Sequence, residues 1–297
     1  LLDPHGGKCA SIQLRKSKEL AISIIDLVQM GYEVVIVHGN GPQVGQIYAA
    51  HEKFEPNTMS LKECTSMTQG YTGAHLQYAI TCEAMERKLN CQGISLISHI
   101  EVDPADKQFN NPDKPIGFTV SKEEAEELTK TYGYTMRENN DGSGFRQVVS
   151  SPRPIKIIEM DAIRHLVDQG FIVIAAGGGG IPVVKQENGT FLGVDAVVDK
   201  DFTAEKLAIE LDAEYLIFIA SVDRVALNFG KPNQEYIDRM TSQEAELLIS
   251  QGEFEAGSIQ PKIMASCNFV NSKKGRKAII TLHNPTVLMA GTTEALA

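Results

Sequence analysis

The stretch that decides the fold reads Glu33-Val34-Val35-Ile36-Val37-His38-Gly39-Asn40-Gly41-Pro42-Gln43-Val44-Gly45. Its β-branched run predicts a strand over residues 33–37, and the glycines after it predict a turn into a helix. Glycines at 39 and 41 have no Cβ atom, so a ligand can approach the backbone N–H groups closely. The N-terminus of the following helix favours an anion at this place. A tight strand-to-helix turn without a ligand is the alternative interpretation of this stretch alone.

Composition and charge narrow the class of protein. The 297 residues are 42% hydrophobic and 22% charged, which is ordinary for a globular α/β protein. A net charge of −10 argues against a broad nucleic-acid-binding face. The longest apolar run, Phe171 to Val184, contains four glycines and is too short to span a membrane. Without a secretory signal, and with five scattered cysteines, we expect reduced thiols and a cytoplasmic location.

Apolar periodicity predicts helices alternating with strands along the chain. The strands lack polar alternation, which is typical of a parallel sheet covered on both faces. The predicted fold is therefore a three-layer α/β/α sandwich with a mainly parallel central sheet, with sites at the carboxyl ends of strands. Gly70 and Gly73 are expected to be close-packing points of a helix. Helices are predicted over 15–30, 60–90, 159–169, 202–212, 241–251 and 260–272, and strands over 93–97, 171–175, 215–219 and 277–281.

Residues 103–150 interrupt this alternation. They are rich in Asp, Asn, Gly, Pro and Glu, and only a short helix is predicted near 121–131. A linker is one interpretation. The aromatic and aliphatic residues of the segment favour an ordered insertion, so we expect a lid or small subdomain within a single domain of residues 1–297.

Three further elements carry candidate chemistry. Gly177 to Gly180 follow a buried strand, and four glycines favour close approach of the backbone to a ligand, with tight strand packing as the alternative. Asp199-Lys200-Asp201 stands at a helix entrance, where a lysine could neutralise a phosphoryl group and an aspartate could hold Mg²⁺ or orient lysines. An acidic cap with a solvated lysine is the alternative there. Lys262 opposes the dipole of its helix, and a bound anion would relieve this.

The common nucleotide fingerprints are absent from the sequence. There is no G-x-x-x-x-G-K-[ST] loop, no well-placed G-x-G-x-x-G and no protein-kinase signature. No Ser/His/Asp or Cys/His arrangement stands out, and His38 is as compatible with a structural role as with a catalytic one.

Taken together, these elements resemble the carbamate kinases of the amino-acid-kinase superfamily over nearly the whole chain. The order and the spacing of the motifs both agree with that family. The matching stretches are 38–45, 67–70 (Met-Thr-Gln-Gly), 102–106 (Val-Asp-Pro-Ala-Asp), 111–117, 151–154 (Ser-Pro-Arg-Pro), 177–180, 198–201, 228–232 and 257–262.

The resemblance implies a phosphotransferase that moves a phosphoryl group reversibly between carbamoyl phosphate and ADP, giving ATP and carbamate. It also implies Mg²⁺ with the nucleotide, no organic prosthetic group, a homodimer and a role such as arginine catabolism. The transfer would be an in-line displacement without a covalent intermediate. Carbamate is already a nucleophile, so no general base is assigned.

The resemblance also implies roles for individual residues. Lys114 and Lys200 match lysines at the transferred phosphoryl group, and Asp199 matches the residue that orients them. No protein ligand for a metal is assigned. The expected substrate-binding residues are Gly39, Asn40, Gly41, Gly178 and Gly179, and the expected nucleotide-binding residues are Lys262, Asp201, Ser221 and Asp223.

The sequence departs from the family pattern at four places. The family's first strand and Gly-Gly-Asn loop are expected to precede Leu1, since Gly6-Gly7 follows no strand. Ser143 replaces an arginine, Ser98-His99-Ile100 replaces Thr-Gln-Val, and Ala220-Ser221 replaces a strand-end threonine. Two alternatives therefore stay open: a kinase of the same fold for another small carboxylate, and a non-catalytic carbamoyl-phosphate-binding homologue.

Overall fold

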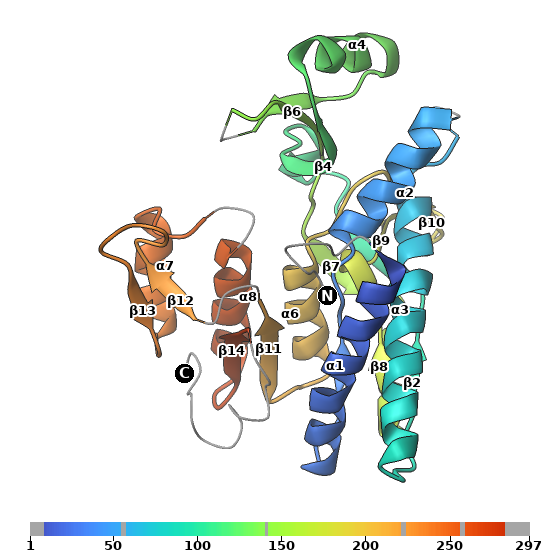
Figure 1. Ribbon diagram of the computed structural model, residues 1–297, viewed down its shortest axis with the longest axis vertical. Coiled ribbons are helices and arrows are strands. Elements are labelled where there is room, and N and C mark those ends of the chain that lie inside the picture. The colour runs from blue at the N-terminus through green and yellow to red at the C-terminus, as the bar shows by residue number, and fades with distance from the viewer. Residues whose placement is uncertain (1–8, 55–57, 140–141, 221–223, 256–258, 283–297) are drawn as a thin grey trace. The chain divides into compact units, whose positions relative to one another are not determined.

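The computed structural model describes residues 9–54, 58–139, 142–220, 224–255 and 259–282 (Figure 1). Contacts between Cα atoms divide the chain into two compact units. The first holds Leu1–Lys18 and Val35–Lys200, and the second holds Glu19–Val34 and Asp201–Ala297. Helix α1 (Ala10–Gln29) begins earlier than predicted and contributes residues to both units. Both units combine helices with parallel strands, which confirms the predicted α/β class.

A parallel sheet lies at the centre of the first unit. Its strand order is β1 (Val35–Ile36), β8 (Ile172–Ile174), β2 (Gly93–Ser95). The three residues of β8 are all buried, as expected for a continuous apolar run between two parallel neighbours. Strand β1 is shorter than the predicted strand over 33–37, because pairing with β8 covers only two residues. The chain therefore leaves the sheet just before the glycine turn.

A second sheet of the first unit was not predicted. Its order is β10 (Phe191–Gly193), β9 (Ile181–Lys185), β3 (His99–Val102), β7 (Pro154–Ile157). Only the pairing of β3 with β9 is parallel. These strands are short and their partners are distant in sequence, so local patterns do not reveal them.

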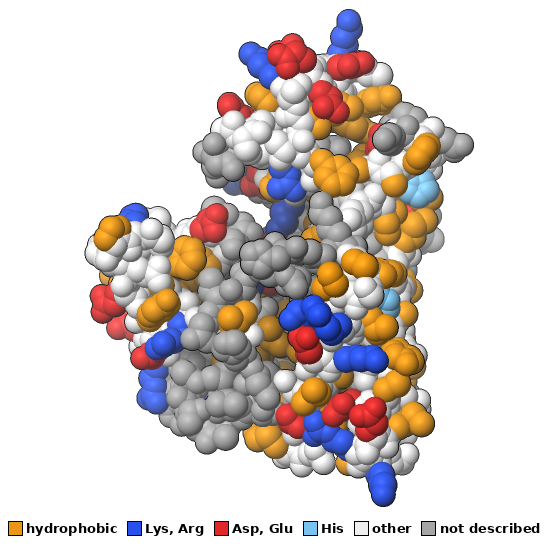
Figure 2. Space-filling model, in the orientation of Figure 1, with side chains coloured by type: hydrophobic (Ala, Val, Ile, Leu, Met, Phe, Trp, Pro, Cys, Tyr) orange, Lys and Arg blue, Asp and Glu red, His pale blue; other side chains and the backbone are white. Residues whose placement is uncertain are grey.

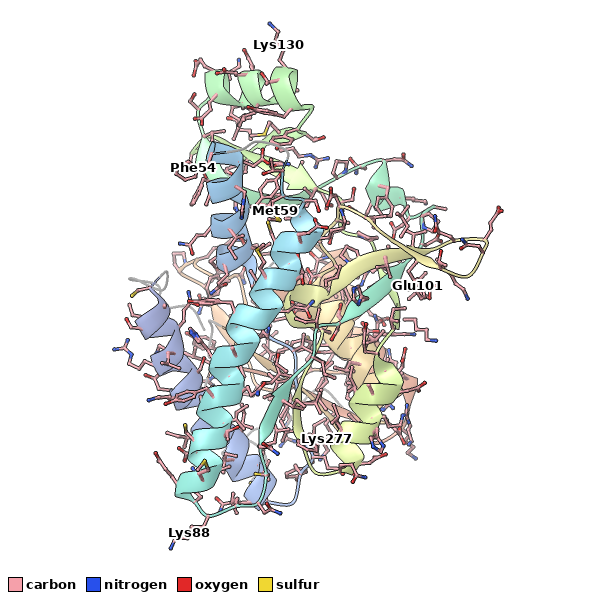
Figure 3. The ribbon with its side chains drawn as sticks, turned by 90° about the vertical axis from the view of Figure 1, so that its right-hand side faces the viewer. Phe54, Met59, Lys88, Glu101, Lys130 and Lys277 are labelled. Carbon is pink, nitrogen blue, oxygen red and sulfur yellow. The ribbon has the colours of Figure 1, made fainter. Side chains whose placement is uncertain are left out.

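Helices α2 (Gly41–Phe54), α3 (Leu61–Glu86) and α5 (Met160–Asp168) complete the body of the first unit. Figure 3 shows α3 on the near side of the molecule, extending from near Met59 to near Lys88. A Cβ atom at Gly73 would lie 2.0 Å from Oγ of Ser95, so this glycine lets α3 pack against β2. The close-packing expectation is confirmed there and wrong at Gly70, where a Cβ atom would meet nothing within 4 Å.

The inserted segment forms a small sheet with one helix. Strands β4 (Lys114–Val120), β6 (Phe145–Val149) and β5 (Met136–Glu138) pair in this order, and α4 (Lys122–Tyr132) joins β4 to β5. A short 3₁₀ helix, η1 (Lys107–Phe109), precedes β4. The linker interpretation is therefore wrong for the described part of this segment. The Tyr134 hydroxyl donates a hydrogen bond to Glu52, which attaches the small sheet to α2.

The described residues of the second unit form two two-stranded sheets and nearly all of three further helices, the first of which begins at Lys200. Strands β11 (Tyr215–Ile219) and β14 (Lys277–Thr281) pair in parallel with the predicted bounds, and β12 (Val225–Leu227) pairs with β13 (Glu235–Ile237) in antiparallel fashion. The helices are α6 (Lys200–Glu210), α7 (Ser242–Ser250) and α8 (Ile259–Ser272). Within the described ranges, no helix combines the length and the hydropathy that a membrane span requires.

Candidate active site

The loop between β1 and α2 is held by buried polar contacts. Asn40 is 6% exposed, and its Nδ2 donates a hydrogen bond of 2.8 Å to Oγ1 of Thr68 on α3. Its carbonyl oxygen accepts the first helical hydrogen bond of α2, from the Val44 N–H at 2.9 Å. Asn40 thus caps α2 through its backbone while its side chain fixes the loop against α3. Thr68 belongs to a motif quoted for the family resemblance, but the sequence alone assigned no role to it.

The four glycines after β8 pack tightly against protein atoms. A Cβ atom at Gly177 would lie 2.2 Å from Nε2 of His38, and one at Gly178 would lie 2.1 Å from Nδ2 of Asn40. At Gly179 it would lie 2.0 Å from the Val198 carbonyl oxygen. Gly178 and Gly179 also have φ values of 68° and 96°, which favour glycine. Close packing against these loop residues therefore requires glycine at the three positions, and the approach of their backbone to a ligand stays a prediction.

The contacts of these glycines bring three segments of the first unit together. The Gly178 N–H donates to the His38 carbonyl at 2.7 Å, which joins the loop 38–41 to the loop 177–180. A Cβ atom at Gly179 would also lie 3.3 Å from the backbone nitrogen of Lys200. A Cβ atom at Gly39 would lie 3.4 Å from Cδ and Cε of Lys200, so the lysine side chain extends past the glycine backbone. The predicted residues Gly39, Asn40, Gly178, Gly179 and Lys200 are thus neighbours.

An ion pair lies next to this group of residues, because one of its members directly precedes Lys200 in the sequence. The Nζ of Lys114, at the start of β4, lies 2.6 Å from Oδ2 of Asp199, just before α6. The Asp199 side chain is 10% exposed and that of Lys114 is 28% exposed. Charge-assisted hydrogen bonds of this kind are short and strong. Lys114 of the small sheet is therefore held next to Asp199, which directly precedes Lys200 in the sequence.

His38 is buried beside the same loops and is uncharged. It is 5% exposed, and burial lowers its pKa to about 4. Its Nδ1 lies 3.2 Å from the Gly39 carbonyl, and because a carbonyl can only accept, Nδ1 carries the proton. Nε2 faces Gly177.

Support for the glycine loop comes from a further buried network. The side chain of Gln69 makes two hydrogen bonds with the backbone of Ser98, at 2.8 and 3.2 Å. The Ser98 hydroxyl in turn accepts from the Ala176 N–H at 3.0 Å. Gln69 thereby connects α3 to the residue before Gly177. Two of the departures from the family pattern have partners within the protein. His99 pairs with Glu159, 60 positions along the chain, and the Ser143 hydroxyl accepts a hydrogen bond from the side chain of Asn139.

In the second unit, Lys262 and Asp201 form an ion pair. The Nζ of Lys262 lies 3.0 Å from Oδ2 of Asp201, and the side chains are 14% and 4% exposed. The carboxylate supplies an anion that offsets the unfavourable position of Lys262 near the start of α8. The remaining predicted nucleotide residues, Ser221 and Asp223, lie outside the described residues, as do Gly6-Gly7 and Gly257-Ser258.

The described residues include no group of three or more His, Cys, Asp or Glu side chains that could hold a metal ion. Kinases typically hold Mg²⁺ through one or two carboxylates and the phosphates of the substrate. Asp199 in the first unit and Asp201 in the second unit each offer a carboxylate beside a lysine, which is the kind of ligand that fits a Mg²⁺ ion arriving with a nucleotide.

Comparison with known proteins identifies the family. The model of the amino acid kinase family matches residues 5–281. The chain is 46% identical to a carbamate kinase of Clostridium perfringens, covering 96% of this chain and 92% of the relative. It is 43% identical to the carbamate kinase-like protein YqeA of Escherichia coli, covering 91% and 88%.

Solved structures agree with these sequence comparisons. The carbamate kinase of Giardia lamblia bound to AMP-PNP matches with a TM-score of 0.88 and 33% identity, covering 99% of this chain and 93% of that one. The chain belongs to the amino acid kinase family.

Proposed function

We propose that this protein is a carbamate kinase, an enzyme that transfers a phosphoryl group between carbamoyl phosphate and ADP to give ATP and carbamate. The observation that carries the proposal is the arrangement of Lys200 beside Gly39, with Lys114 paired to Asp199 next to it in sequence. Two cationic side chains beside a glycine loop suit a small anion that carries a phosphoryl group. The identity to carbamate kinases of 42–46% over more than nine tenths of the chain supports the same activity.

Each residue has a role in the proposed transfer. Lys114 and Lys200 offset the negative charge on the moving phosphoryl group, and Asp199 holds Lys114 in position. Gly39, Asn40 and Gly41 surround the carbamate group. Gly178 and Gly179 line the same place through their backbone. Because carbamate is itself the nucleophile, positioning and charge supply the rate acceleration.

The nucleotide is proposed to use residues of the second unit. Lys262 would contact its phosphates, and Asp201 would hold the lysine side chain through the ion pair already described. Ser221 and Asp223 are proposed as further nucleotide contacts. Mg²⁺ would supply additional positive charge to the phosphates, with Asp201 as a carboxylate able to hold it. Working toward ATP, the enzyme would serve a catabolic route that releases carbamoyl phosphate, such as arginine breakdown.

We also propose a homodimer formed through the outer face of α3. From Cys64 to Cys82 this helix contains no Lys, Arg, Asp or Glu. Figure 2 shows hydrophobic side chains along the right-hand edge of the view, over and beside α3. An uncharged apolar face fits an identical face on a second copy, because a two-fold interface pairs the same patch with itself. The exposed large apolar residues of α3 are Met67, Tyr71, Tyr78 and Met85.

The activity can be tested with a panel of acyl phosphates. ADP and Mg²⁺ are incubated with carbamoyl phosphate, acetyl phosphate or an aminoacyl phosphate, and ATP is measured with a coupled assay. The proposal predicts turnover with carbamoyl phosphate at least about 10²-fold above the others in kcat/KM. Preference for another acyl phosphate would select a kinase of the same fold for a different acid. Folded protein without turnover on any of them would contradict the proposal.

A further inference from the structure

We propose that His38 is a positioning residue whose ring sets the spacing between the loop 38–41 and the loop 177–180. The inference rests on the proposed function, since that function places the carbamate group at these loops. It concerns a residue to which neither the sequence motifs nor the comparisons assign a role.

The ring occupies the space of an absent side chain. A Cβ atom at Gly177 would lie 2.2 Å from Nε2, 2.4 Å from Cε1 and 2.9 Å from Cδ2 of His38. All three are below 3.0 Å, a separation that real Cβ contacts essentially never show. The backbone of Gly177 lies outside the left-handed region, unlike that of the next three glycines. The ring of His38, and not backbone strain, therefore excludes a side chain at position 177.

The ring lies where the two strands separate. Strands β1 and β8 pair through Ile36 and Ile174, and the Ala175 N–H still donates to the Ile36 carbonyl at 3.0 Å. Beyond this point the chains diverge into the two loops. The next bond between them is the one from the Gly178 N–H to the His38 carbonyl, at 2.7 Å. The backbone and the ring of His38 thus fix both the contact and the separation of the loops.

An imidazole has a second function here that an aliphatic side chain would lack. Its Nδ1–H holds the carbonyl of Gly39, the residue before Asn40. The side chain of Asn40 in turn covers Gly178. A shift of His38 would therefore move the backbone around the proposed carbamate position, while Lys262 and Asp201 keep their own ion pair in the second unit.

The inference is tested by removing the side chain at position 38 and adding a methyl group at position 177, separately and together. The variants His38→Ala, Gly177→Ala and the double variant are compared with wild type. We expect each single variant to raise the KM for carbamoyl phosphate about tenfold or more, with the KM for ADP within about twofold. The double variant should recover part of the loss, because the new methyl group fills space that the ring vacates. Unchanged KM for carbamoyl phosphate in His38→Ala, or additive losses in the double variant, would overturn the proposal.

Two further variants separate positioning from a general loss of stability. Ile80→Ala removes a fully buried side chain from α3, where it packs beside Gly93 at the start of β2, and should lower Tm without changing either KM. His38→Gln keeps a donor for the Gly39 carbonyl and should lie between wild type and His38→Ala. It also keeps the test open if His38→Ala does not fold.

Amide hydrogen exchange gives a readout that does not depend on turnover. Peptides covering 38–41 and 177–180 should exchange faster in His38→Ala, by about tenfold, and slow again in the double variant. If wild type fails to turn over carbamoyl phosphate, the proposed function fails, and the exchange experiment still decides the role of His38. Unchanged exchange in both peptides would overturn it.

Discussion

The ammonium of Lys114 lies 2.6 Å from a carboxylate oxygen of Asp199, although 85 positions separate the two residues in sequence. Lys114 opens the first strand of the small inserted sheet, and Asp199 directly precedes Lys200. The contact therefore places the start of the inserted sheet beside Asp199, the residue before Lys200, to which the proposed mechanism assigns the transferred phosphoryl group. The ion pair also stabilises the ordered conformation of the inserted segment.

Replacement of Lys114 by methionine should impair catalysis strongly. The variant keeps the length and the packing of the side chain but removes its charge from the phosphoryl group. We expect kcat/KM for carbamoyl phosphate to fall about 10²- to 10³-fold, as when other preorganised electrostatic contacts are removed. Lys122→Met, an exposed lysine in the same inserted segment, is the matched control and should retain activity. Equal activity of the two variants would show that Lys114 has no role in transfer.

The variant Asp199→Asn should act through Lys114. An amide at position 199 preserves the shape but weakens the hold on the ammonium, so we expect a loss of about tenfold or more in kcat/KM. Combined with Lys114→Met it should cost far less than the product of the two single effects, because both changes disrupt one contact. A double-mutant cycle on initial rates measures this coupling, and strictly multiplicative losses would contradict it.

Gly179→Ala should destabilise the protein. The residue has φ of 96°, and a Cβ atom would lie 2.0 Å from the Val198 carbonyl oxygen. We expect a loss of about 3 kcal/mol or more in the free energy of unfolding, measured with urea. Gly170→Ala is the control, because its φ of 81° is also positive but an added Cβ atom meets nothing within 4 Å. That variant should lose only about 1 kcal/mol, the cost of the backbone conformation without the clash.

Burial of neutral His38 should make stability depend on pH. Its pKa is lowered from 6.5 to about 4 in the folded protein, so between these values the unfolded chain binds more protons than the native one. The free energy of unfolding therefore rises with pH across this window. The contribution is complete above about pH 6.5 and is lost as the pH falls toward 4, by roughly 3 kcal/mol in total.

Urea unfolding of wild type and His38→Gln between pH 4 and 7.5 measures this contribution. The difference between the two proteins should grow more favourable to wild type as the pH rises through the window. A difference that is constant with pH would mean that His38 titrates normally.

Much of the framework follows from local sequence patterns. The strands over 215–219 and 277–281 were predicted with the observed bounds, because each is a short run rich in β-formers next to a helix boundary. The resemblance to carbamate kinases agrees with the family that the comparisons show.

Other parts depend on contacts between distant residues. Within 103–150 an ordered insertion was predicted, but the only element assigned was a helix, whereas Lys114 of β4 pairs with Val149 of β6, which is 35 positions further along the chain. Such pairing leaves little local pattern. The neighbours of Gly177 and Gly178 are likewise side chains on another loop. The sequence predicted that the backbone of these glycines lies close to another group, but it could not identify His38 and Asn40 as that group.

The proposed dimer predicts the effect of a charge on α3. Tyr78 is 55% exposed on the uncharged face, and Tyr78→Glu would bury two like charges near each other in a two-fold interface. We expect wild type to sediment as a dimer and this variant as a monomer. Leu247→Glu, a similarly exposed apolar position on α7, should leave the dimer intact. A wild-type monomer at micromolar concentration would contradict the proposal.

ATP formation from carbamoyl phosphate, ADP and Mg²⁺ tests the central claim most directly when wild type and Lys200→Met are assayed together. Lys156→Met on β7, an exposed lysine, serves as the control. The account predicts rapid ATP formation by wild type and the control, and a loss of about 10³-fold in Lys200→Met. Absence of ATP formation by folded wild type, or near-normal turnover by Lys200→Met, would contradict it.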